Sequence, residues 1–91
     1  MSHWEYRIGF KRHIINGEEV LEYGLTEAYY NDKGDLWLTT ERFIEPSGET
    51  KEELIENLEM MLKDAKKDAQ VLDLEKLWKE LEMKEKLENE L

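Results

Sequence analysis

The chain has 91 residues, of which 40% are apolar and 40% charged, and it carries a formal net charge of −10 and no cysteine. This length allows one domain with one modest core. The charge argues against non-specific nucleic-acid binding, because a phosphate backbone would be repelled, and the lack of cysteine excludes disulfides, thiolate nucleophiles and cysteine-ligated zinc.

Two strands are predicted at the start of the chain. Apolar and polar side chains alternate over residues 4–14, which is the period of a strand with one face in water. The dipeptide Asn16-Gly17 follows and tolerates the positive φ values of a type I′ turn, so the chain should reverse into an antiparallel strand over about residues 20–30. Ala28 and Tyr30 disturb the alternation of this second strand, and we expect a bulge or twist near Glu27.

A third strand is predicted over residues 35–44. Residues 31–34 are a cluster of turn formers, and the segment that follows them is rich in β-branched and aromatic side chains. The Pro-Ser-Gly sequence at residues 46–48 should then end the sheet, because proline cannot donate to a strand ladder and glycine frees the backbone. The three strands would form an antiparallel meander.

Two helices are predicted in the second half of the chain. Thr50 and Glu53 match a capping box, so a helix should begin at Lys51, and its apolar side chains recur at spacings of three and four residues. We expect this helix to cover the apolar face of the sheet. Residues 71–72 form a short extended piece, and Asp73 is a suitable cap for a second amphipathic helix over residues 74–91.

These elements predict an α+β fold, a three-stranded antiparallel β-meander followed by a packing helix (βββα) and a second, C-terminal amphipathic helix. We expect a βββα domain over residues 1–73 and a helical extension over residues 74–91. The second helix is marginal by itself and needs a surface to pack on. That surface is its own sheet, a second copy of the chain, or a different protein.

The sequence contains no recognisable catalytic motif. His3 and His13 lie on one face of the first strand, roughly 30 Å apart at the rise of an extended strand, so they cannot share a metal ion. The carboxylate of most interest is Glu27, which lies among tyrosines. One hypothesis for the function is therefore a small enzyme or ligand-binding protein built around Glu27, and it ranks behind the two hypotheses given below. We predict a protein that is not an enzyme and has no cofactor, metal or catalytic residues.

The aromatic residues favour a role in protein–protein interaction. One helix covers only one face of a sheet, and Trp37 alternates with leucines on the third strand, which leaves an apolar patch for a partner. The leading hypothesis is a non-enzymatic interaction module that binds another protein or forms a homo-oligomer, most simply a dimer. The residues predicted to bind the partner are Trp37, Tyr30, Leu74, Leu77, Trp78 and Leu81.

The alternative hypothesis is an acidic, antitoxin-like or phage-encoded inhibitor. Its surface would occupy a basic, nucleic-acid-binding site on a target protein, with charge complementarity speeding the association. Neither hypothesis includes direct nucleic-acid binding or a membrane. No apolar run approaches the roughly 20 residues of a membrane span, and the start of the chain has no signal-peptide pattern, so we expect a cytoplasmic protein.

Several segments resemble a family of small uncharacterised bacterial proteins. The resemblance lies in residues 1–7, 22–30, 46–50 together with 53–54, and 71–73. It covers about residues 1–73 and implies a shared fold with no established activity. More distantly, the order of three strands and the helix start at residues 48–54 is similar to the HicB-type antitoxin domain. Those antitoxins commonly carry a DNA-binding module, but residues beyond 73 have neither helix-turn-helix spacing nor a basic face.

Overall fold

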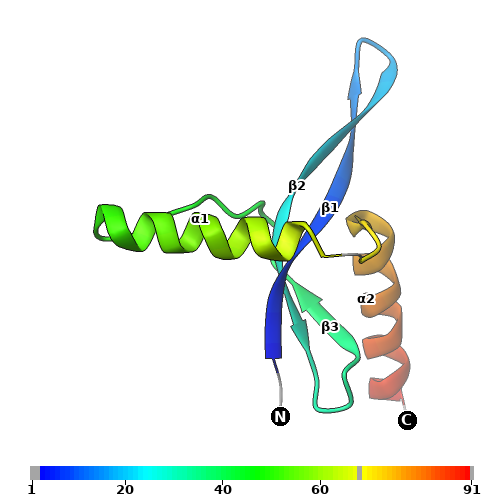
Figure 1. Ribbon diagram of the computed structural model, residues 1–91. Helices are drawn as coiled ribbons and strands as arrows, with labels where there is room; N and C mark the ends of the chain where they lie inside the picture. The colour runs from blue at the N-terminus through cyan, green and yellow to red at the C-terminus, as the bar shows by residue number, and fades with distance from the viewer. Residues whose placement is uncertain (1–2, 68, 91) are drawn as a thin grey trace.

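The computed structural model describes residues 3–67 and 69–90 and has an α+β architecture (Figure 1). A four-stranded mixed sheet has the order β3-β2-β1-β4, and two helices project from it. No helix of the described residues is both long and apolar enough to cross a membrane. The elements are β1 (His3–Ile15), β2 (Glu18–Tyr30), β3 (Leu36–Thr39), α1 (Lys51–Ala65), β4 (Leu72–Asp73) and α2 (Leu74–Glu90).

The β1–β2 hairpin confirms the predicted turn. Asn16 and Gly17 have φ values of 53° and 82°, as a type I′ turn requires. The antiparallel register runs without a break from His3 opposite Tyr30 to Ile15 opposite Glu18. A register shift does occur in β2, but it lies between Tyr29 and Tyr30, on the side that pairs with β3, and not near Glu27.

The predicted third strand is too long. β3 ends at Thr39, although the chain continues along β2 and donates two further hydrogen bonds, from Thr40 N to Glu27 O at 3.0 Å and from Ile44 N to Leu25 O at 2.8 Å. The ladder is interrupted between these two bonds, where residues 41–42 bend. The bend turns the ring of Phe43 onto the sheet, so tertiary packing overrides the local strand preference.

The sheet also has a fourth strand that the sequence did not predict. The short extended piece before α2 is present, and its residues Leu72 and Asp73 pair in parallel with Gly9 and Phe10 of β1. The Asp73 carboxylate accepts two hydrogen bonds from the Arg12 guanidinium, at 2.8 and 2.6 Å, and these bonds hold the pKa of Asp73 below its usual range. Asp73 also accepts from the backbone of Lys76 at 3.4 Å, as the predicted helix cap should.

Two glycines that face each other at the centre of the hairpin receive the large side chains of the surrounding segments. Gly9 lies opposite Gly24 in the register. A Cβ atom at Gly9 would lie 2.8 Å from Leu74 Cγ, and one at Gly24 would overlap the ring of Phe43. Leu74, the first residue of α2, is completely buried. The Gly9–Gly24 pair therefore lets both the start of α2 and the residue 40–50 segment lie close against the sheet.

Helix α1 begins as predicted but covers less of the sheet than expected. The Thr50 side chain accepts from Glu53 N at 3.1 Å, while the Glu53 carboxylate accepts from Glu49 N at 2.9 Å, one residue before the position that a standard capping box uses. Its contact with β1 centres on Tyr6, whose hydroxyl accepts from Asn57 and whose backbone N–H donates to Asp64.

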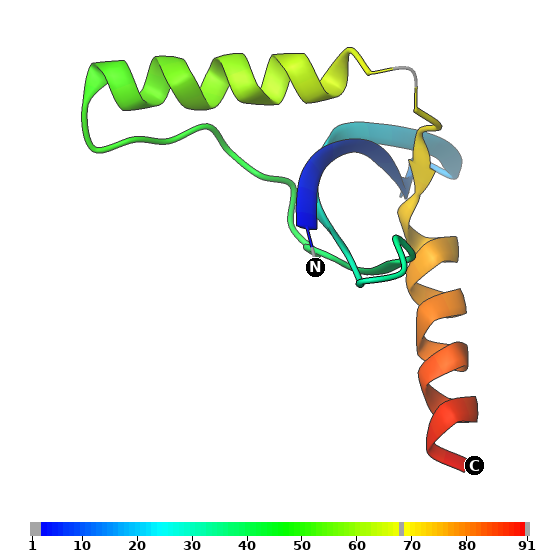
Figure 2. The same cartoon turned by 60° about the horizontal axis from the view of Figure 1, so that its bottom comes forward.

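The chain is unusually extended for its length. α1 and α2 leave the hairpin in different directions (Figures 1 and 2), and the end of the hairpin projects beyond both in the view of Figure 1. The Cα radius of gyration is 15.4 Å, whereas a compact chain of this length has a radius of about 12 Å. The core is correspondingly small, and its buried apolar members are Tyr6, Ala28, Met61 and Leu74.

The glycine pair generates the first prediction. Gly24→Ala should lower the free energy of unfolding by about 1–3 kcal/mol, because the new methyl group overlaps Phe43 in a packed site. An alanine in an otherwise compatible strand position would instead be neutral or stabilising. Urea denaturation measures the effect.

Two further variants serve as controls for this prediction. Glu18→Ala, at an exposed position of the same strand, should change stability by less than about 0.5 kcal/mol. Combining Gly24→Ala with Phe43→Leu should cost less than the sum of the two single changes, since the smaller side chain relieves the overlap. Strict additivity of the two changes would show that Phe43 does not fill the space above Gly24.

Candidate functional site

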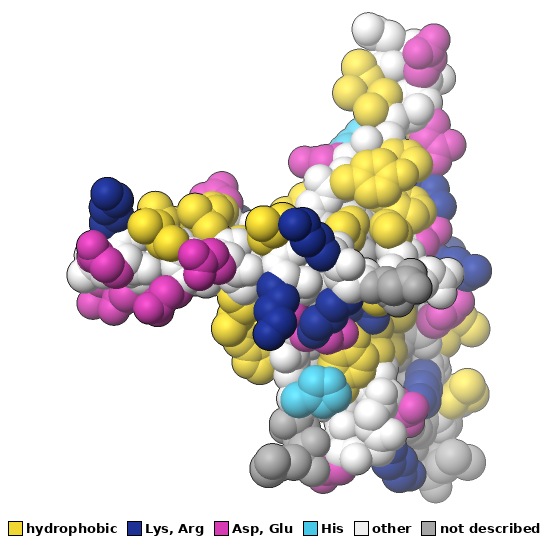
Figure 3. Space-filling view, viewed as in Figure 1, with side chains coloured by type: hydrophobic (Ala, Val, Ile, Leu, Met, Phe, Trp, Pro, Cys, Tyr) yellow, Lys and Arg dark blue, Asp and Glu magenta, His cyan; other side chains and the backbone are white. Residues whose placement is uncertain are grey.

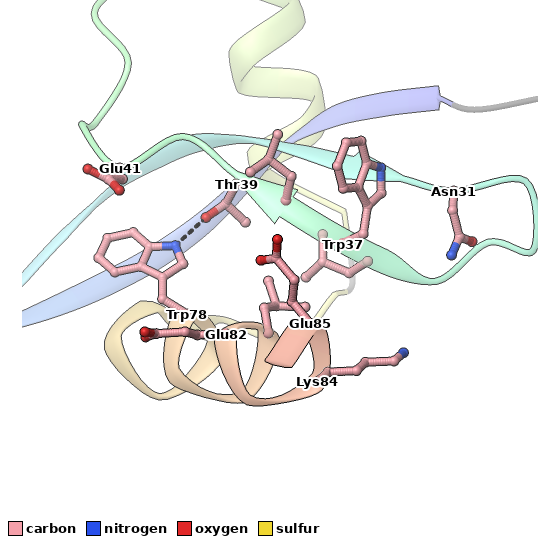
Figure 4. A pocket seen from close by; sticks show the side chains of 11 residues that line it. Asn31, Trp37, Thr39, Glu41, Trp78, Glu82, Lys84 and Glu85 are labelled. Atoms are coloured by element: carbon pink, nitrogen blue, oxygen red, sulfur yellow. Dashed lines mark hydrogen bonds between the residues drawn. The ribbon is translucent and has the colours of Figure 1, made fainter. Parts of the chain in front are cut away.

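An open groove of about 800 Å³ lies between β3 and α2 (Figure 4). Trp78 and Glu85 point from α2 toward β3, Lys84 points outward, and the two tryptophans lie toward opposite ends of the groove. Its volume falls within the range of protein ligand sites. The lining residues are Asn31, Leu36, Trp37, Leu38, Thr39, Glu41, Trp78, Leu81, Glu82, Lys84 and Glu85.

One hydrogen bond fixes the end of the groove at which Trp78 lies. Trp78 Nε1 donates to Thr39 Oγ1 at 2.5 Å, and the Thr39 side chain is buried. Behind this contact the Lys11 ammonium lies 4.5 Å from the centre of the Phe43 ring and 5.7 Å from that of Trp78. A cation over an aromatic face is attracted by the ring quadrupole. Lys11 therefore contacts both Phe43 in the 40–50 segment and Trp78 in the first turns of α2.

The groove combines an apolar floor with an acidic border. Trp37 and Leu38 are 53% and 46% exposed, which is unusual for side chains of this size. Glu41, Glu82 and Glu85 outnumber the single cation Lys84 among the lining residues. This arrangement suits a ligand that presents apolar side chains together with positive charge.

The structure brings half of the predicted partner-binding residues together. Trp37, Trp78 and Leu81 line the groove, although the first lies about forty residues from the other two in the sequence. Leu77 is half-buried and is not among the lining residues. Leu74 is completely buried over Gly9, so the prediction that it contacts a partner is corrected: it belongs to the core.

Tyr30 is held by its own neighbours and does not line the groove. Its hydroxyl accepts from Arg7 at 2.8 Å and donates to Glu5 at 2.9 Å, and its ring stacks on His3 with 4.7 Å between the centres. These contacts occupy the polar end of the side chain and one face of the ring. Tyr30 therefore stabilises the end of the hairpin.

Comparison of the chain with family models, with curated proteins and with solved structures finds no match. The resemblances to a small bacterial family and to the HicB-type antitoxin domain are therefore untested, and they stay predictions.

The side chains considered for catalysis have structural contacts. Glu27 is half-buried and accepts a hydrogen bond from the Tyr29 hydroxyl, and this bond raises the pKa of Tyr29 because its anion would face a carboxylate. His13 contacts Glu22 at 2.8 Å on the exposed part of the hairpin. Among the described residues no group of three potential ligands is placed to hold a metal ion.

The acidic border was not recognised in the sequence. Glu82 and Glu85 lie in a helix where almost every turn carries a glutamate, so no local pattern separates them from solvent-facing neighbours. Their distance to Glu41 depends on how α2 crosses β3. The one available signal was the recurrence of Trp78, Leu81 and Glu85 at helical spacing on one side of α2.

The Trp78–Thr39 bond can be tested directly. Trp78→Phe keeps an aromatic ring but removes the donor, and it should lower the free energy of unfolding by about 1 kcal/mol. Thr39→Val removes the acceptor. The double variant should lose less free energy of unfolding than the two single variants combined, as measured by urea denaturation in a double-mutant cycle. A coupling energy of zero would mean that this bond does not hold α2 at the sheet.

Proposed function

We propose that this protein is a non-enzymatic interaction module that binds a segment of another protein in the groove between β3 and α2. The segment carries apolar side chains next to lysine or arginine. The observation that carries this proposal is the meeting of exposed Trp37 and half-buried Trp78 with three glutamates around one open groove. These glutamates are Glu41, Glu82 and Glu85.

The tryptophans would supply most of the binding energy. Large aromatic side chains are enriched among the residues that dominate protein interfaces, because they bury much apolar area at little cost in conformational entropy. Trp78 is already held by Thr39, so little of its freedom remains to be lost on binding. Trp37 is exposed and would be covered by the incoming segment.

The glutamates would select the charge of the segment. Like charges facing each other across an interface weaken binding, and opposite charges steer the encounter. The net charge of −10 for the whole chain also attracts a positively charged partner at longer range. A basic and apolar segment satisfies both parts of the groove.

A random peptide library displayed on phage tests this proposal. Peptides selected on the intact protein should be rich in lysine or arginine next to aromatic or aliphatic residues. Trp37→Ala should weaken their binding by about 30-fold, the loss of about 2 kcal/mol that marks a dominant interface residue. A separate double variant, Glu82→Lys with Glu85→Lys, should also weaken peptide binding and should reduce the dependence of that binding on salt.

The matched control places the same charge change elsewhere. Glu56→Lys combined with Glu59→Lys also adds two cations at the expense of two carboxylates, but on α1 and outside the lining of the groove. Peptide binding should be nearly unchanged in this control at moderate salt. Equal losses in the two double variants, or selected peptides without a basic excess, would contradict a role for the groove.

The inhibitor hypothesis differs in the extent of the surface involved. The specific observation in its favour is that the negative charge is spread along the chain: residues 1–50 hold ten acids and five bases, and residues 51–91 hold thirteen acids and eight bases. An inhibitor of a nucleic-acid-binding site would use the acids of both halves of the chain. Charge reversal in either half should therefore weaken its binding to the target protein.

Competition with DNA separates the two proposals. If the partner recovered from cells loses DNA binding in the presence of this protein, and if both glutamate double variants reduce that effect, the inhibitor role is supported. A partner that binds the groove and DNA at the same time would contradict it.

A further inference from the structure

A second surface formed by the described residues is largely apolar and stays exposed to solvent. It comprises two rows of side chains, one on α1 and one on the distal half of the β1–β2 hairpin, and we call it the α1–hairpin face. Figure 3 shows both rows, one along α1 and the other on the projecting hairpin. Its members are Ile55, Leu58 and Leu62 on α1 and Ile14, Leu21 and Tyr23 on the hairpin, with exposed fractions between 40% and 72%.

The hairpin row lies on the face of the sheet that α1 already covers in part. Side chains of a strand alternate between faces, and directly opposed residues of an antiparallel pair share a face. Tyr6, which contacts α1, is therefore on the same face as Phe10 and its partner Tyr23, and as Ile14 further along. α1 crosses the hairpin near Tyr6 and leaves the distal part uncovered (Figure 1).

The helix row follows from the rotation of α1. At 3.6 residues per turn, Asn57, Met61 and Asp64 lie on the side that faces the sheet of the same chain. Leu58 and Leu62 lie on the adjoining side and border an open apolar groove with Leu25, Ile44 and Pro46. An amphipathic helix normally buries its apolar stripe, whereas here Leu58 and Leu62 stay 45% and 55% exposed.

The exposed area sets an upper limit on the size of the missing contact, because the open groove between β3 and α2 contributes to the same total. The chain exposes 7411 Å², whereas a compact monomer of 11.0 kDa exposes about 5,600 Å². The excess is about 1,800 Å² per chain, or about 3,600 Å² for a pair, within the range of permanent homodimer interfaces. Crystal-type or transient contacts are much smaller.

We infer that a second copy of this chain covers the α1–hairpin face, with α1 of each copy packed on the distal hairpin of the other. A two-fold axis between the copies would then bury both exposed rows in a single self-complementary interface. A foreign partner would need to supply both a helix-like and a sheet-like apolar surface in the same arrangement.

The acids nearest this pairing are paired or lie to one side: on the hairpin, Glu19 shares the face of Ile14 and forms an ion pair with Arg12 at 3.0 Å. Glu52, Glu53, Glu56 and Glu59 all lie at least 100° around α1 from Leu58, at the 100° per residue of an α-helix. They therefore border the interface or face water, where salt screens their repulsion.

The pairing is independent of the proposed peptide groove. None of the six residues of the α1–hairpin face lines the groove between β3 and α2. A monomeric protein that still binds basic peptides would overturn only the dimer, whereas a dimer that binds none would overturn only the proposed function.

The mass in solution is the first test. Light scattering of the intact protein should give twice the 11.0 kDa of one chain, and Leu58→Asp should halve the measured mass. Met60→Asp is the matched control, because Met60 is also exposed but lies on the opposite side of α1, and this variant should stay dimeric. A monomeric native protein overturns the inference, as does a dimer that Leu58→Asp leaves intact while circular dichroism shows the fold retained.

Disulfide cross-linking tests the arrangement without relying on a disruptive substitution. The chain has no cysteine, so single cysteines report only on the positions chosen. When a Tyr23→Cys chain is mixed with a chain carrying one cysteine on α1, the mixed disulfide should form best at positions 58 and 62 and least at positions 56 and 60. Yields that do not follow the helical period would overturn the packing of α1 on the hairpin of a second copy.

Discussion

The close approach of other segments to the Gly9–Gly24 pair is the constraint on which the rest of the structure depends. The pair lies at the middle of a hairpin whose register has no break, and neither glycine has a side chain of its own to fill the space above it. Leu74 and Phe43 fill that space instead. The position of Leu74 fixes where α2 begins, and the position of Phe43 fixes where the third strand stops.

The candidate groove is a consequence of that packing. Once Leu74 is buried over the sheet, the next turn of α2 brings Trp78 to Thr39, and the following turns carry Glu82 and Glu85 past β3. The short parallel contact of β4 with β1 and the Arg12–Asp73 ion pair hold the helix start at the edge of the sheet. A rigid helix in that position forms the second wall of the groove and keeps an apolar floor open between two tryptophans.

The molecule presents two surfaces of different character. The groove is apolar with an acidic border and suits a basic segment, whereas the α1–hairpin face is apolar across its centre with the acids of α1 displaced from it. If the second surface pairs two copies, each assembly carries two grooves. A partner with two basic segments would then bind with an advantage set by effective concentration.

The sequence by itself determined the local elements: the hairpin around Asn16-Gly17, the helix start at Thr50 and the helix cap at Asp73 all follow from side chains close in sequence. Tryptophan and leucine positions also pointed to part of the groove. Only the tertiary structure decided the length of β3, the pairing of β4 and the meeting of Glu41, which follows β3, with the glutamates of α2. Those features depend on contacts between segments about twenty to sixty residues apart, whose geometry no local pattern encodes.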